Sequence, residues 1–192
     1  SETDTEIIPH LIEDCYTESK ISGNKKVGGL IGYNKDEIKK SYANPQTEVE
    51  GKEIVGGLVG ENKGLIKETY SQAKIEGQKT VGGLAANNNQ NGVITGSYTQ
   101  TSVQIKAIKN LGGLVGSNQG KISSSYTQVS VKGNQAVGGL VGLNEGMIEE
   151  SASRRRKERD KDQIQASGDQ EIGGLVGKNK AGTIKESQAE IN

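Results

Sequence analysis

Short apolar segments alternate with polar residues and with Gly/Asn turns along almost the whole chain. One stretch contains three of them, IVGGLVG (54–60), GLIKETY (64–70) and QAKIEG (72–77). These segments are four to seven residues long and rich in Val, Ile, Thr and Tyr, and no 3.6-residue period is sustained anywhere. The pattern therefore predicts strands throughout and no helix.

The segments recur as a repeat of about 26 residues. Gly-Gly-Leu occurs six times, with first glycines at positions 28, 56, 82, 112, 138 and 173. Aligning these copies brings other residues into columns. The Ile column is Ile12, Ile38, Ile66, Ile94, Ile122, Ile148 and Ile184. Three residues later comes the hydroxyl column, which is Cys15, Ser41, Thr69, Ser97, Ser125, Ser151 and Ser187. The Tyr column follows it, as Tyr16, Tyr42, Tyr70, Tyr98 and Tyr126.

A repeat of this length without helices predicts an all-β fold, a parallel β-solenoid (β-helix) of six to seven three-strand coils. In such a fold the Ile column forms the core and the tyrosines stack between coils. An Asn column is expected to form a ladder at a turn; it comprises Asn34, Asn62, Asn87 or Asn88, Asn118, Asn144 and Asn179. The glycine pairs serve corners where a Cβ would clash or where φ is positive. The period does not decide whether the Leu or the following Val of each Gly-Gly-Leu unit faces the core, and it leaves the handedness open.

The repeat has one large interruption. After Ser153 nine extra residues, Arg154–Asp162 (RRRKERDKD), precede the resumed pattern, and we expect them to form a charged loop on a solenoid that spans residues 11–192. The basic residues of this loop are candidate contacts for a phosphate or an acidic glycan; they are Arg154, Arg155, Arg156, Lys157 and Arg159. The alternative is a solvated loop, because nearby acidic residues offset much of the charge.

A polar tail at residues 1–10 precedes the repeat array, and both ends of the array lie in mid-coil. Solenoids need polar end caps, and no cap is evident. We therefore expect either a segment of a larger surface protein or a unit that stacks on neighbouring copies through its ends.

Catalytic and cofactor chemistry is not evident in the residues. One cysteine and one histidine, Cys15 and His10, provide no disulfide framework and no Cys- or His-based metal pair. The stretch GSNQGKIS (116–123) falls one residue short of a Walker loop. Its sister copies GENKGLIK and GLNEGMIE carry Leu65 and Met147 at the position of Lys121. The acidic residues form no convincing column. We expect no enzyme, no catalytic residue, no metal and no cofactor.

Charge and hydropathy exclude two further classes of partner. With 24 basic and 24 acidic residues the formal net charge is zero, so we expect no nucleic-acid partner. No apolar run is long enough to cross a bilayer, so we expect no membrane insertion.

The repeated Gly-Leu-(Val/Ile)-Gly core resembles the GLUG motif of bacterial surface proteins. It stands at 29–32, 57–60, 113–116, 139–142 and 174–177, and the third unit departs from it with Ala85-Ala86. GLUG repeats are found in non-catalytic regions of streptococcal immunoglobulin A zinc metallopeptidases and in large adhesins. The resemblance implies an extracellular location at the bacterial cell surface or cell wall. It carries over no zinc site, because His-Glu-x-x-His is absent from this sequence.

Three functions follow as hypotheses. The first is a non-catalytic scaffold or interaction module of an extracellular surface protein, such as the non-catalytic region of an immunoglobulin A protease. The second is an adhesin segment that binds a host glycan or host protein. The third is a self-assembling filament subunit.

Overall fold

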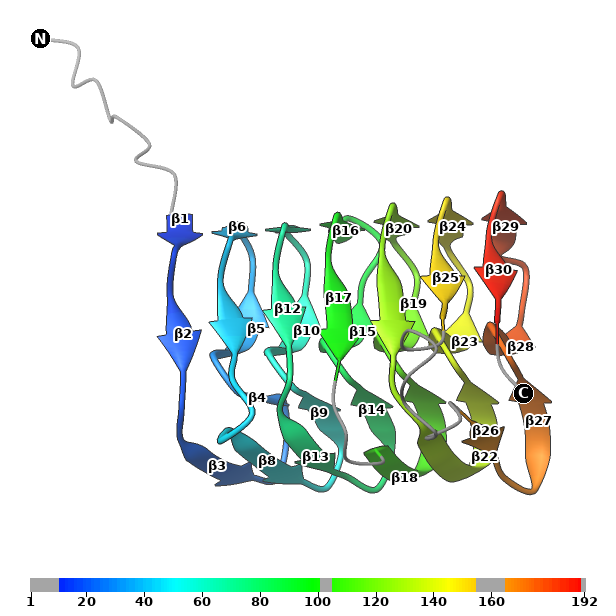
Figure 1. Cartoon of the computed structure of the whole chain (residues 1–192), viewed down its shortest axis with the longest axis horizontal. Helices are drawn as coiled ribbons and strands as arrows, with labels where there is room; N and C mark the ends of the chain where they lie inside the picture. Colours follow the sequence, from blue (N-terminus) through cyan, green and yellow to red (C-terminus); the bar gives the residue numbers. More distant parts are fainter. Residues whose placement is uncertain (1–10, 101–104, 155–164, 191–192) are drawn as a thin grey trace, which may run out of the picture.

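The computed structural model describes residues 11–100, 105–154 and 165–190. Every regular element in these ranges is a short β-strand, and every strand pairing is parallel. Successive coils of the chain lie side by side, so the colour in Figure 1 changes steadily from blue at one end of the rod to red at the other. The predicted parallel β-solenoid is confirmed, but the expected three strands per coil are wrong, because each complete coil contributes to four sheets.

Two sheets of seven strands carry the Ile column and the Tyr column. Sheet A consists of β1 (Leu11–Glu13), β6 (Glu37–Lys39), β11 (Leu65–Lys67), β16 (Val93–Thr95), β20 (Lys121–Ser123), β24 (Met147–Glu149) and β29 (Thr183–Lys185). Sheet B consists of β2 (Tyr16–Thr17), β7 (Tyr42–Ala43), β12 (Tyr70–Ser71), β17 (Tyr98–Gln100), β21 (Tyr126–Gln128), β25 (Ala152–Ser153) and β30 (Gln188–Ala189).

Sheet C follows sheet B along the chain, and each coil contributes a bent or divided strand to it. Its first segments are β3 (Lys20–Gly23), β8 (Glu48–Gly51), β13 (Lys74–Glu76) and β26 (Ala166–Ser167). Its second segments are β4 (Val27–Gly28), β9 (Ile54–Gly56), β14 (Thr80–Gly82) and β27 (Gln170–Gly173), and in two coils both segments merge into β18 (Ile105–Gly112) and β22 (Val131–Gly138).

Sheet D completes each coil with the Val-Gly-x-Asn stretch. Its six strands are β5 (Ile31–Asn34), β10 (Val59–Asn62), β15 (Ala85–Asn88), β19 (Val115–Asn118), β23 (Val141–Asn144) and β28 (Val176–Asn179). The segment expected as one strand, IVGGLVG, is therefore two strands in two sheets, β9 and β10. The chain turns so sharply between them that only glycine fits at position 56, because a Cβ there would lie 1.9 Å from the carbonyl oxygen of Val59.

The core is a stack of aliphatic columns. Ile38, Ile66, Ile94, Ile122 and Ile148 have no exposed surface, as expected for the Ile column. The open question about the Gly-Gly-Leu-Val stretch has a double answer, since the Leu and the following Val are both buried in the central coils. The pairs are Leu58 with Val59, Leu114 with Val115, and Leu140 with Val141. The chain has no Phe or Trp, and each of these coils instead buries two consecutive aliphatic side chains where it passes from sheet C to sheet D.

Two polar or aromatic columns join each coil to the next. The Asn side-chain amides form the expected ladder, in which each Nδ2 donates to the Oδ1 of the next coil at 2.8–2.9 Å; the sequence is Asn34, Asn62, Asn88, Asn118, Asn144 and Asn179. The five tyrosines stack with ring centroids 4.8–5.5 Å apart and interplanar angles of 3–14°. Both columns therefore hold neighbouring coils in register.

The hydroxyl column supports the corner between sheets A and B. Ser125 Oγ accepts from the backbone N–H of Ser97 at 3.2 Å and donates to its own chain at Ser123 O, 2.8 Å away. Cys15 takes the same place in the first coil, because its thiol donates to Glu13 O at 3.3 Å.

Candidate interaction surfaces

The insertion leaves the solenoid at the corner between sheets B and C. Strand pairing resumes after it in the predicted register, with Val131 opposite Ala166. Of the candidate contact residues the structure places Arg154. Its guanidinium carbon lies 5.6 Å from the ring centroid of Tyr126, and its backbone N–H donates to Thr127 O at 2.9 Å. Arg154 is therefore an exposed cation at the end of the Tyr column. The others, Arg155, Arg156, Lys157 and Arg159, lie outside the described residues.

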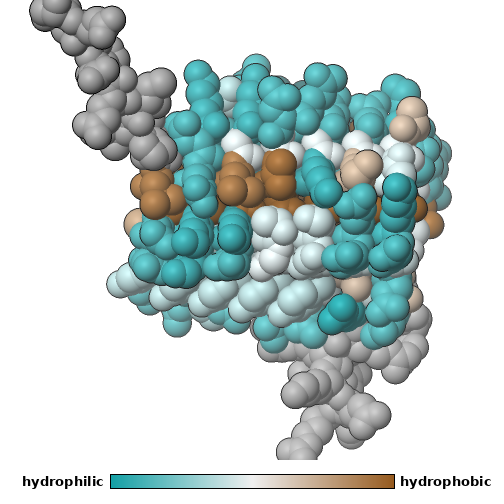
Figure 2. All heavy atoms as spheres, turned by 90° about the horizontal axis from the view of Figure 1, so that it is seen from above, coloured by the Kyte–Doolittle hydropathy of each residue, from teal (hydrophilic) through white to brown (hydrophobic). Residues whose placement is uncertain are grey.

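The outer face of sheet A is mostly hydrophilic, with a narrow apolar stripe along the rod (Figure 2). Leu11 is 47% exposed, Leu65 and Val93 are half-buried, and the charged side chains of Glu37 and Lys121 interrupt the row. Ion pairs such as Lys121 with Glu149 at 2.7 Å cross between coils on this face. The face is a solvated surface whose charges are largely used within the solenoid.

An ion pair with a buried carboxylate and a half-exposed lysine lies on sheet D. The side chain of Glu61 is only 10% exposed; its carboxylate lies 2.7 Å from Lys26 Nζ and accepts from the amide of Asn89 at 2.7 Å. Lys26 in turn lies 4.9 Å above the ring of Tyr33. Burial by itself would raise the pKa of the Glu61 carboxyl, but the ammonium of Lys26 and the amide of Asn89 outweigh burial and hold this pKa below its usual value.

Acid should weaken the fold partly through Glu61. Its pKa is lowered on folding, so its contribution is present above the unfolded-state pKa and is lost as the pH falls through the folded-state pKa. We expect the urea midpoint of the wild type to fall more between about pH 7 and about pH 3 than that of Glu61→Gln. Lys79 and Lys25 also lower the pKa of the Glu53 carboxyl, so Glu53→Gln should reduce the pH dependence in the same direction. Equal pH dependence in wild type and Glu61→Gln would contradict the assignment.

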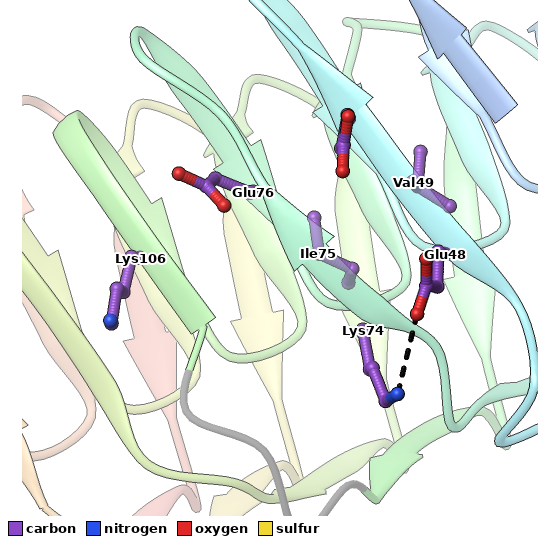
Figure 3. Close-up of a pocket in the computed structure, with 7 residues that line it drawn as sticks. Glu48, Val49, Lys74, Ile75, Glu76 and Lys106 are labelled. Carbon is purple, nitrogen blue, oxygen red and sulfur yellow. Dashed lines mark hydrogen bonds and ion pairs between the residues drawn. The ribbon is translucent and has the colours of Figure 1, made fainter. Parts of the chain in front are cut away.

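A groove with a volume of about 400 Å³ runs across sheet C. Figure 3 shows Glu76, Lys106 and the Glu48–Lys74 pair around it. A second hollow of about 620 Å³ continues from Lys106 toward Lys132 and Asp169. The two hollows differ in the sign of their net charge, because the first is lined by three acids (Glu48, Glu50, Glu76) against two lysines (Lys74, Lys106), and the second by two lysines (Lys106, Lys132) against Asp169.

This surface was missed in the sequence, where no acidic column was recognised. In the structure Glu50 and Glu76 are direct partners on neighbouring strands. The signal was available, because these residues immediately follow the apolar positions Val49 and Ile75 of the repeat. Glu50 and Glu76 are 26 residues apart, which is the basic repeat length, so they could have been aligned from the sequence.

Within the described ranges no three His, Cys, Asp or Glu side chains are placed to share a metal ion. The adjacent carboxylates Glu149 and Glu150 have separate partners, Lys121 at 2.7 Å and Ser124 Oγ at 3.0 Å. The part of the chain that the structure describes also contains no helix of the length and apolar character needed to cross a membrane.

Comparison of this chain with protein-family models, with curated proteins and with solved structures found no match. Function must therefore be inferred from the rod and its surfaces.

Proposed function

We propose that the chain is a non-catalytic scaffold and interaction module of an extracellular bacterial surface protein. The observation that carries this proposal is the continuity of the side-chain ladders. Asn118, for example, accepts from Asn88 and donates to Asn144, both at 2.8 Å, so the amide of one coil is bonded to the coils on both sides. A rod with such internal bonding suits a rigid support for other parts of a protein.

The outer surface supports the same proposal. Many exposed charges pair between neighbouring coils, as Lys79 does with Glu53 at 3.2 Å and Lys180 with Glu145 at 3.2 Å. These ion pairs link neighbouring coils at the surface of the rod, and they do not present reactive groups. The resemblance to GLUG repeats supports an extracellular setting, and the non-catalytic region of an immunoglobulin A protease is the parent that we propose.

The location and the lack of catalysis are tested together. Antibodies raised against the folded chain should label intact cells of the source organism, and brief treatment with an added protease should remove the label. The purified chain should leave immunoglobulin A uncleaved. Labelling that appears only after the cells are permeabilised would contradict an extracellular role, and cleavage by the purified chain would contradict a non-catalytic one.

A second candidate function is adhesion to an anionic host glycan, and Arg154 is the observation that favours it. Its backbone is held by Thr127 and its guanidinium by the ring of Tyr126, so an exposed cation is presented in a defined place. On a glycan array we expect binding to sulfated or sialylated members, and loss of that binding in Arg154→Ala. Arg154→Lys keeps the charge and should retain part of it. If the chain bound no anionic glycan on the array, that result would contradict this function.

A further inference from the structure

The charges on sheet C follow an unusual order along the rod. One outward-facing row crosses six neighbouring strands, each residue being the direct partner of the next, and we call it the charge row: Ser22, Glu50, Glu76, Lys106, Lys132 and Ser167. Two glutamates are followed by two lysines, and a serine stands at each end. Rotation by 180° about an axis between Glu76 and Lys106 places every acid of the row on a base.

This order is unfavourable within a single chain. Like charges directly opposite each other on neighbouring strands are destabilising, and the row contains two such contacts, Glu50 with Glu76 and Lys106 with Lys132, against one contact between opposite charges, Glu76 with Lys106. Lys20 partly balances Glu50, at 3.3 Å. Within the described residues, Glu76, Lys106 and Lys132 have no ion pair.

Two hollows, of about 400 and 620 Å³, accompany the charge row. The acid-lined groove and the base-lined hollow lie on opposite sides of the midpoint of the charge row, and Lys106 borders both. Beside the lysines, Ile108 on β18 is 53% exposed. A partner with a base-lined hollow opposite this acid-lined groove would neutralise both halves and cover this apolar side chain.

We propose that sheet C is a docking surface for a second copy of this chain, bound antiparallel about a two-fold axis between Glu76 and Lys106. Glu76 of each copy then meets Lys106 of the other, and Glu50 meets Lys132. The arrangement is isologous, so it closes as a dimer and does not propagate. This association is separate from end-to-end stacking, because it uses a side of the rod.

The expected affinity is low. Six strands spaced ~4.8 Å apart and about four residues wide give a contact of roughly 400 Å² per copy, half of a standard interface. We therefore expect a Kd on the order of 100 µM, weakened by salt because the contacts are ionic. Copies held close together on one surface would associate at a lower bulk concentration.

Sedimentation equilibrium between about 10 µM and about 1 mM tests the proposal, since this range brackets the expected Kd. The wild type should show a monomer–dimer equilibrium. Glu76→Lys and Lys106→Glu should each weaken it at least tenfold, because the two-fold axis repeats each altered contact. The double variant Glu76→Lys/Lys106→Glu restores complementarity and should recover the wild-type Kd.

Glu37→Lys and Lys185→Glu, on sheet A, make the same changes in net charge on another face and serve as matched controls. They should leave the Kd unchanged. All substituted side chains point outward, so circular dichroism should report an intact fold for every variant. A monomer throughout the range, a double variant as weak as the single ones, or an open-ended series of larger species would overturn the proposal. The last result would instead favour a filament built through the ends.

Discussion

Ile122→Asp is expected to abolish the cooperative unfolding transition of the central coils or to lower its midpoint severely. Ile122 is fully buried on β20, between Ile94 and Ile148 of the neighbouring strands. The substitution removes an aliphatic side chain, worth about 2–5 kcal/mol, and places a carboxylate where no cation is available. The sum is comparable to the whole stability of a domain, about 5–15 kcal/mol.

Thermal melting followed by circular dichroism measures this effect. Val93→Asp is the matched control, since Val93 faces outward on the adjacent strand of the same sheet and stands opposite Lys121. It should cost no more than about 1 kcal/mol. If Ile122→Asp melted at the wild-type temperature, the Ile column would not be the core of the solenoid.

Gly112→Ala should be nearly as damaging, although it adds a single methyl group. The new Cβ would lie 1.9 Å from the carbonyl oxygen of Val115 and 2.8 Å from the backbone nitrogen of Gly142. Both obstacles are backbone atoms, which cannot rotate away as a side chain can. The corner between sheets C and D would have to open, and we expect a loss of more than about 3 kcal/mol.

The control for this prediction is Gly96→Ala. Gly96 has a φ of +57°, but the nearest atom to its Cβ position is 3.7 Å away, so the only cost is the left-handed backbone, about 1 kcal/mol. Glu68 and Ser124 occupy the same column in other coils with φ of 54° and 47°. In urea unfolding, the midpoint of Gly112→Ala should lie well below that of Gly96→Ala. The reverse order would mean that conformational freedom, rather than space, selects the glycines.

The repeat columns were predictable because a parallel solenoid places equivalent residues of successive coils directly opposite one another. Identical side chains then contact each other, which is why Asn62 and Asn88 form an amide ladder and Tyr70 and Tyr98 stack. A column in the sequence therefore predicts contacts between its members. Arg154 was singled out on a different ground, because it begins the insertion that interrupts the columns.

The corners were less predictable. Glycine was expected either where φ is positive or where a Cβ would clash, and the structure separates the two cases. Among the described glycines only Gly96 has positive φ, whereas Gly112 and its equivalents avoid clashes with backbone atoms. Positive φ falls instead on residues such as Glu68 and Ser124 at the corner between sheets A and B. The sequence does not distinguish these causes, because close approach depends on atoms three residues ahead and one coil away.

The sequence alone determined that the chain is built of strands, and it determined the repeat and the ladders, since each follows from periodicity and from the contact of like with like. Only the tertiary structure decided that each coil bends at its Gly-Gly pair, that Leu58 and Val59 are both buried, and that the charge row exists. The physical reason is that burial and charge pairing depend on where each corner turns. Corners of unequal length displace residues along the sequence without displacing them in space, so Glu76 and Lys106 become neighbours although 30 residues separate them.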